Sequence, residues 1–167
     1  MTPKQFVSAN LADAKICESA TGIHYVATLT QAALESGWGK YAPGNMFFGI
    51  KDTDGVNGNE QLITTTEYTR SSKNPMPVFI STTPVIKNGV KMFKHIGKDY
   101  FRKYNTPADS FKDHSRFFFE NKRYANALKV RGDYNKFFEE LQKAGYATDP
   151  NYANTLKAVA KTVIKNL

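Results

Sequence analysis

TQAALESGWGK, residues Thr30 to Lys40, is the stretch around which this chain is organised. Its first five residues carry no charge and suit a helix, and Gly37 suits the left-handed position that ends one. Together with the apolar spacing upstream, the stretch predicts a helix over residues 23–36. The last turn of that helix carries a single carboxylic acid, Glu35.

Glu35 is electrostatically out of place there. The C-terminal end of a helix carries a partial negative charge, so an exposed carboxylate costs roughly 0.3–1 kcal/mol. The same field raises the pKa of the carboxyl group, and an indole such as Trp38 raises it further by desolvation. A carboxyl group that keeps its proton near neutral pH can act as a general acid. Glu35 is therefore the leading catalytic candidate; the alternative is an acid hydrogen-bonded to the following turn.

Length and composition fit one folded domain. The chain has 167 residues, of which 41% are hydrophobic and 23% charged. Its net charge of +8 favours an anionic partner, which could be nucleic acid, an acidic membrane face or a cell-wall polymer. The single Cys17 excludes an intrachain disulfide and is expected to be a small buried hydrophobe. No run approaches the ~20 apolar residues of a membrane span, and the N-terminus lacks the pattern of a signal peptide.

Helix signals occupy both ends of the chain. Thr2-Pro3-Lys4-Gln5 predicts a capped helix start, and Thr21-Gly22 ends that helix. Thr106-Pro107 repeats the start, and Asp133 and Asp149-Pro150 begin two later helices. A short helix is expected near residues 123–128.

Between these helices, residues 61–104 are typical of strands. Residues 61–68 are rich in β-branched side chains, and Asn88-Gly89 predicts a tight hairpin. The expected strands are residues 61–68, 78–80, 85–86, 90–93 and 99–104. The sequence therefore predicts an α+β fold, a mainly helical lobe with a small antiparallel β-lobe at about residues 61–104, in one domain over residues 1–167.

Glu67 is the candidate partner of Glu35. Glycoside hydrolysis usually needs two carboxylates across the scissile bond, and Glu67 lies in the first expected strand among uncharged neighbours. The alternative is an exposed strand residue. The acidic run at residues 52–60 lacks the Gly and Glu positions of an EF-hand, and His24, His95 and His114 have no metal-binding spacing. No metal or other cofactor is predicted.

Four motifs occur in a fixed order: QAALESGWGK (31–40), NMFFGIK (45–51), TTTEY (64–68) and AGYATDPNYANTL (144–156). Together they closely resemble the glucosaminidases of glycoside hydrolase family 73, which cleave bacterial peptidoglycan and include flagellar rod-cap hydrolases, autolysins and phage lysins. The resemblance covers nearly the whole chain. It implies a lysozyme-like fold with an α-lobe and a β-lobe.

The resemblance also implies roles for particular residues. Glu35 matches the general acid, Glu67 the second carboxylate and Tyr146 a tyrosine near the reacting sugar. The bond cut would be the β-1,4 link between N-acetylglucosamine and the following N-acetylmuramic acid. The second step is left open between a base at Glu67 and the substrate's own acetamido group. The residues expected to bind substrate are Trp38, Asn45, Phe48, Gly49, Tyr68 and Tyr152.

One departure concerns NMFFGIK, because the family usually has one residue fewer between its Asn and Gly. Either the loop bulges, or Asn45 is displaced from its usual role.

Two other functions stay open: a lysozyme-like muramidase or lytic transglycosylase, and a non-catalytic basic module that binds cell wall or nucleic acid. Glu35 in an intact LESGWG context argues against the second. We expect a monomer that acts on peptidoglycan glycan strands outside the cytoplasm or in the periplasm, as a phage lysin or a domain of a larger wall enzyme.

Overall fold

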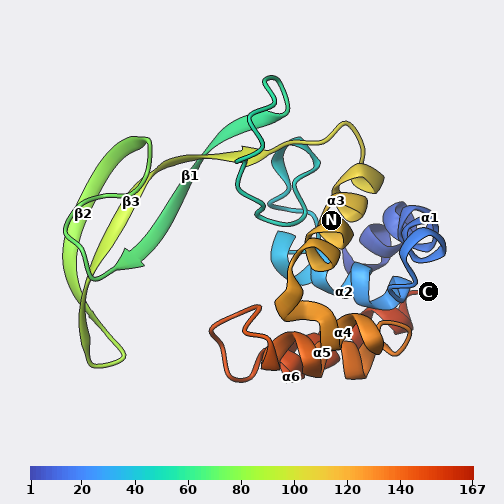
Figure 1. Ribbon diagram of the computed structural model, residues 1–167. Helices are drawn as coiled ribbons and strands as arrows, with labels where there is room; N and C mark the ends of the chain where they lie inside the picture. Colours follow the sequence, from blue (N-terminus) through green and yellow to red (C-terminus); the bar gives the residue numbers. More distant parts are fainter. The chain divides into compact units, whose positions relative to one another are not determined.

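A computed structural model describes residues 1–167 as six α-helices and a three-stranded antiparallel sheet (Figure 1). The chain forms two compact units, a helical unit of residues 1–49 and 104–167 and a sheet unit of residues 50–103. The helices are α1 (Pro3–Thr21), α2 (Tyr25–Ser36), α3 (Pro107–Glu120), α4 (Ala125–Lys129), α5 (Tyr134–Lys143) and α6 (Tyr152–Lys165). The strands are β1 (Glu60–Thr69), β2 (Val78–Lys87) and β3 (Val90–Arg102). The predicted α+β class is confirmed, although the sheet unit begins earlier than the predicted residue 61.

The predicted helix caps are present. Thr2 and Gln5 form a reciprocal capping box at the start of α1, and Thr106 and Asp109 form another at α3. The Asp133 side chain accepts hydrogen bonds from two backbone N–H groups of α5. Two starts were predicted too early: α2 begins at Tyr25 because His24 serves as its N-cap, and α6 begins at Tyr152.

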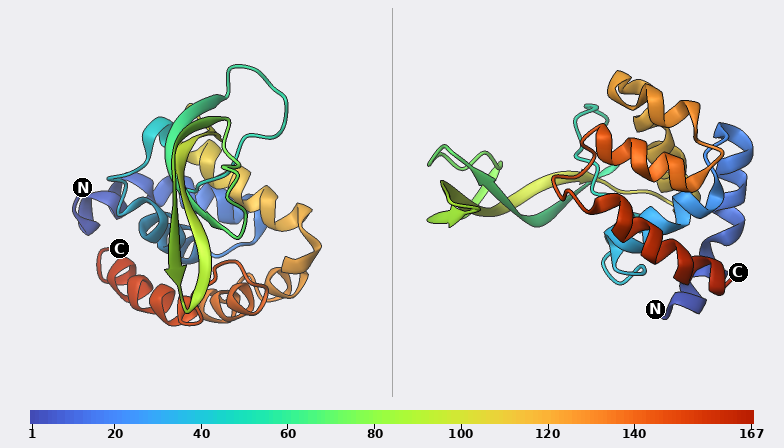
Figure 2. Two further views of the ribbon diagram at one scale, coloured as in Figure 1. Left: turned by 90° about the vertical axis from the view of Figure 1, so that its left-hand side faces the viewer. Right: turned by 90° about the horizontal axis from the view of Figure 1, so that it is seen from below.

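Helix α2 is the centre of the helical unit. Nine of its twelve residues are buried, and it packs against α1 and α6. Helices α1 and α6, which come from opposite ends of the chain, also contact each other. Figure 2 shows the two ends of the chain in the helical unit. Cys17 is buried in α1, as predicted. Because its body is fixed by the core on several sides, α2 holds its C-terminal turn, and therefore Glu35, in a defined place. None of the helices is both long and apolar enough to cross a membrane.

The sheet has the strand order β1-β3-β2, with β3 in the middle. The prediction of short, separate strands after residue 77 was wrong, because β2 and β3 are long and continuous. Gly97 would normally weaken a strand, but here a Cβ atom would lie 2.5 Å from the Val78 carbonyl oxygen. The close approach of β2 therefore requires glycine at this position. Asn88 and Gly89 both have positive φ, at 52° and 76°, which confirms the predicted tight hairpin.

Candidate active site

Glu35 is the penultimate residue of α2, and a tight turn follows it. Gly37, Trp38 and Gly39 all have positive φ, at 57°, 60° and 75°. The turn is fixed by the Trp38 N–H, which donates to the Ala33 carbonyl at 2.8 Å, and by the Gly39 N–H, which donates to the Ser36 hydroxyl at 2.8 Å. Left-handed backbone is costly for a tryptophan, and such strain is concentrated at functional sites.

Two buried side chains orient the Glu35 carboxyl group. The Tyr152 hydroxyl donates to Glu35 Oε1 at 3.1 Å. Gln31 Nε2, one helical turn before Glu35, donates to the same hydroxyl oxygen at 3.3 Å. Because the Gln31 amide occupies the acceptor side of the hydroxyl, the single Tyr152 proton is directed at the carboxylate. These three residues form a chain of hydrogen bonds that ends at the candidate acid.

The surroundings favour a protonated Glu35. The residue as a whole is exposed, so its proton can exchange with solvent, but the protein around the carboxyl group raises its pKa by desolvation. The hydrogen bond from Tyr152 stabilises the carboxylate and partly offsets that rise. Burial and the nearby Glu35 charge both raise the pKa of Tyr152, so this hydroxyl stays protonated and can remain a donor. The general acid inferred from sequence thus has a physical basis.

Tyr146 joins the same group through ring contacts. Its ring stacks on Tyr152, with centroids 5.6 Å apart and planes 18° from parallel. Its hydroxyl lies 2.9 Å from His114 Nε2. His114 is 3% exposed and stacks on Phe48 with centroids 3.6 Å apart. Burial lowers the pKa of His114 to about 3, so the imidazole is neutral at ordinary pH. The neutral imidazole fixes the position of the Tyr146 hydroxyl through this hydrogen bond.

The NMFFGIK loop packs beneath the residues around Glu35, and its two phenylalanine rings are not exposed to a ligand. Phe47 and Phe48 are both buried, at 6% and 2% exposure, and both pack on Phe111 of α3. Phe48 was expected to bind substrate, but its ring is covered, so that expectation is corrected to a supporting role under His114. Both phenylalanines of the motif are therefore core residues.

Asn45, Gly49 and Trp38, which were also expected to bind substrate, lie at different positions in the helical unit. Asn45 has a φ of 54°, and its side-chain amide donates to the carbonyls of Tyr104 and Asn105 at 3.0 and 3.1 Å. It thereby ties the loop to the segment before α3. Gly49 is exposed at the end of the loop. Trp38 is partly exposed, and its ring packs edge-on against Phe6 with centroids 5.7 Å apart.

Glu67 and Tyr68 belong to the sheet unit, on opposite faces of β1. Glu67 is opposite His95 in the β1–β3 register, and Tyr68 is opposite Lys94. Successive strand residues point to opposite faces, so the two side chains cannot contact one ligand on one face of the sheet. Glu67 is paired with Lys51, which also contacts Asp99 at 2.7 Å. The Tyr68 ring is covered by the Lys87 ammonium group, 3.9 Å from its centroid.

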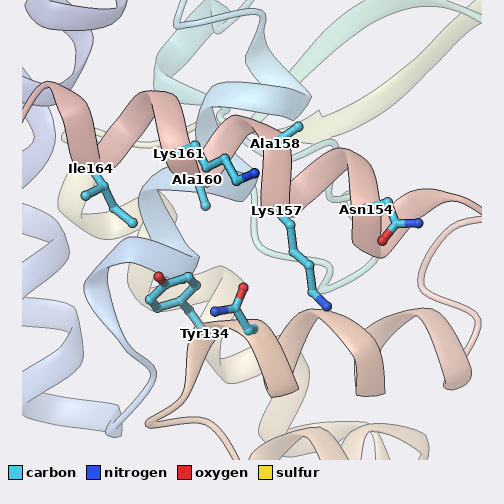
Figure 3. Close-up of a pocket in the computed structure, with 8 residues that line it drawn as sticks. Tyr134, Asn154, Lys157, Ala158, Ala160, Lys161 and Ile164 are labelled. Carbon is cyan, nitrogen blue, oxygen red and sulfur yellow. The ribbon is translucent and has the colours of Figure 1, made fainter.

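A separate hollow on the helical unit lies between α5 and α6 (Figure 3). Its volume is about 380 Å³, and it contains neither Glu35 nor either tyrosine of the acid's surroundings. Lys157, which reaches across it, is ion-paired with Glu139 at 2.5 Å. No carboxylate or imidazole group lines this hollow. Its lining residues are Tyr134, Asn135, Asn154, Lys157, Ala158, Ala160, Lys161 and Ile164.

Comparison with known proteins decides the family. Residues 11–165 match the glucosaminidase family, described as mannosyl-glycoprotein endo-beta-N-acetylglucosaminidase. The chain belongs to the glucosaminidase family. The family-73 resemblance carried by the four motifs is thereby confirmed, and the chain is a glycoside hydrolase by membership.

Among the relatives of this chain, one protein is named a peptidoglycan hydrolase in several bacteria and another is named an exo-glucosaminidase. The peptidoglycan hydrolase FlgJ of Vibrio parahaemolyticus is 32% identical over 168 residues, which covers 97% of this chain and 48% of that protein. The exo-glucosaminidase LytG of Bacillus subtilis is 29% identical, covering 80% of this chain and 42% of that protein. The chain thus spans less than half the length of these two relatives.

Solved structures share the fold of this glucosaminidase. The C-terminally truncated glycoside hydrolase domain of Salmonella typhimurium FlgJ has a TM-score of 0.71 at 29% identity, covering 98% of this chain and 99% of that one. The catalytic domain of the Listeria monocytogenes autolysin Auto has a TM-score of 0.72 at 22% identity, covering 99% and 87%. The predicted lysozyme-like α+β fold is confirmed.

Sequence reasoning missed Gln31, Lys51 and His114. Gln31 could have been found, because residues four apart share one face of a helix and Gln31 precedes Glu35 by four. Lys51 and His114 carry no such local signal. Each meets its partner only through the fold: Lys51 contacts a strand 16 residues later, and His114 contacts Tyr146, 32 residues later.

Proposed function

We propose that this glucosaminidase is a peptidoglycan hydrolase, an endo-β-N-acetylglucosaminidase that cleaves the β-1,4 bond between N-acetylglucosamine and N-acetylmuramic acid. The observation that carries the proposal is the Glu35 carboxyl group, whose pKa is raised by desolvation and which Tyr152 holds by a hydrogen bond. Family membership supplies the substrate class, since relatives are named peptidoglycan hydrolases and a glucosaminidase. The net charge of +8 would help a monomer stay on an anionic wall.

In the first chemical step, protonated Glu35 gives its proton to the bridging oxygen. The bond from that oxygen to C1 of N-acetylglucosamine breaks, its electron pair leaves with the oxygen, and positive charge develops at C1 and the ring oxygen. The muramic acid product departs with a new hydroxyl group. Water then adds to C1 and gives up a proton, which Glu67 takes where it acts as the base. Exchange with solvent then returns a proton to Glu35 and removes one from Glu67, which restores the enzyme. Tyr152 keeps the Glu35 side chain in one orientation while it gives up its proton.

Glu67 is proposed as the second carboxylate, either as the base for water or as a negative charge that stabilises the transition state. Replacing Glu67 by Gln should lower the rate roughly tenfold, below the 10²–10⁴ of a typical acid–base residue, because the acetamido route bypasses a base. Turnover on purified peptidoglycan measures this loss. Glu60→Gln, at the start of the same strand, is the matched control. Equal rates for Glu67→Gln and wild type would make Glu67 only a partner of Lys51.

The Tyr152 hydrogen bond sets the pH range of the acid. Activity needs protonated Glu35, so the rate should fall as pH rises through the pKa of that group. The bond lowers the pKa of Glu35, and its removal in Tyr152→Phe should raise it. We therefore expect the basic limb of the pH–rate profile to move to higher pH in Tyr152→Phe. A basic limb at an unchanged or lower pH would show that the Tyr152 hydroxyl does not stabilise the carboxylate.

The bond cleaved is tested by mass spectrometry of products from purified peptidoglycan. Fragments with N-acetylglucosamine at the reducing end are expected. Reducing-end muramic acid would instead identify a muramidase, and the anhydro form a lytic transglycosylase. Released single N-acetylglucosamine would indicate exo action, as in the name of the Bacillus relative.

A further inference from the structure

The β2–β3 hairpin continues beyond the three-stranded part of the sheet. Strand β1 pairs with β3 only as far as Thr69 opposite Phe93. Beyond that pair, β2 and β3 continue alone through Val85–Met92 and Ile86–Lys91 to the turn at Asn88-Gly89 (Figure 1, green to yellow). We call residues 84–94 the hairpin end; it comprises this two-stranded part and the adjoining residues 84, 93 and 94. A two-stranded ribbon is at best marginally stable in water and gains from any surface that covers it.

The hairpin end is apolar and cationic at once. Ile86 is 75% exposed and Val90 41% exposed. A hollow of about 430 Å³ is lined by Pro84, Val85, Ile86, Lys91, Met92 and Phe93. Three lysines accompany them, at positions 87, 91 and 94. No carboxylate occurs in the chain between Glu67 and Asp99, whereas that stretch holds five lysines and one arginine.

We propose that the hairpin end docks on an anionic lipid bilayer surface. Ile86 lies opposite Lys91 and Val90 opposite Lys87, so the two apolar side chains are on opposite faces of the ribbon, and the hairpin end would enter the bilayer surface tip first. At the boundary between headgroups and acyl chains both side chains would leave water, and the lysines would contact lipid phosphates. Tyr68 and Lys87, in contact at 3.9 Å, form the amphipathic pair typical of a membrane interface. This inference goes beyond the proposed hydrolase activity and does not depend on it.

Charge and shape argue against two other occupants. A second copy would place like-charged lysines together, and β2 is a poor edge for strand pairing, with Pro84 in it and a bulge between Phe79 and Ser81. A soluble polyanion would satisfy the lysines but leave Ile86 and Val90 in water. An anionic bilayer, which combines negative charge with an apolar phase, matches both features of the hairpin end.

The test is co-sedimentation of the full chain with vesicles of phosphatidylcholine, with and without phosphatidylglycerol, at low and high salt. Binding is expected only with phosphatidylglycerol and should weaken as salt rises. Ile86→Ser/Val90→Ser should weaken partitioning about tenfold or more. Lys87→Gln/Lys91→Gln/Lys94→Gln should weaken it about a hundredfold, because each lysine near an anionic surface contributes roughly fivefold.

Matched controls come from the helical unit. Ile16→Ser/Ile164→Ser removes two exposed aliphatic residues, and Lys4→Gln/Lys112→Gln/Lys165→Gln removes three exposed lysines. Both should bind vesicles like the wild type. The proposal is overturned by absence of binding to phosphatidylglycerol vesicles at low salt, or by unchanged vesicle binding of Ile86→Ser/Val90→Ser. Dimerisation that the same apolar change abolishes would also overturn it, by assigning the surface to a second copy.

Discussion

Glu35→Gln is expected to lower the rate of peptidoglycan cleavage by about 10²–10⁴, the usual contribution of a positioned general acid. Glutamine keeps the size of the side chain and an oxygen that can accept the hydrogen bond from Tyr152. It cannot give a proton to the leaving oxygen. The effect should therefore appear in turnover, measured as release of soluble fragments from purified walls, and much less in binding of the wall.

The same change should leave the protein at least as stable near neutral pH. The pKa of Glu35 is raised in the folded state, so folding stability falls as pH rises through it, and the carboxylate lies at the unfavourable end of α2. Glutamine removes both costs. Glu120→Gln, at the last residue of α3, is the control, since it removes another carboxylate from a helix end. Glu35→Gln with wild-type turnover, or with reduced stability, would remove the basis of the assignment.

The fold was predictable wherever its cause is local. The caps at Thr2, Thr106 and Asp133 and the hairpin turn at Asn88-Gly89 each depend on a few adjacent residues, and all were found from sequence. The extent of β2 and β3 was not found. The continuity of these strands depends on pairing across the sheet. Gly97 does not mark a break in β3; it is required because the Val78 carbonyl of β2 approaches closely.

The candidate site likewise contains residues that could be predicted from local sequence and residues whose roles depend on distant contacts. Glu35 could be found because its helix and the following turn are encoded in eleven consecutive residues. Tyr152 was found only through a motif, and as a substrate-binding residue, because its contact with Glu35 spans 117 residues of chain. The position of Glu67 and Tyr68 on opposite faces of β1 could have been anticipated, since successive residues of a strand point to opposite faces.

Lowering the pH from 7 to 4.5 is expected to cost the wild-type protein roughly 2–3 kcal/mol of stability through His114 alone. The residue is buried between Phe48 and Tyr146, and burial lowers the pKa of its imidazole from 6.5 to about 3. Between those two values the unfolded chain binds a proton that the folded chain does not. Stability therefore falls as pH drops through this window, by at most about 1.4 kcal/mol per pH unit.

His114→Gln removes the titration while keeping a nitrogen near the position of Nε2 for the Tyr146 hydroxyl. The variant should be less stable than wild type at pH 7, because it loses the ring stacked on Phe48. The stability that the variant loses between pH 7 and pH 4.5 should nevertheless be smaller than the wild-type loss by roughly 2–3 kcal/mol, as measured by urea unfolding at both values. Leu141→Ala, a buried change without a titrating group, should be destabilised equally at both pH values relative to wild type. If His114→Gln and wild type lose the same stability on acidification, the imidazole is protonated in the folded state, and Tyr146 is not held by a neutral ring.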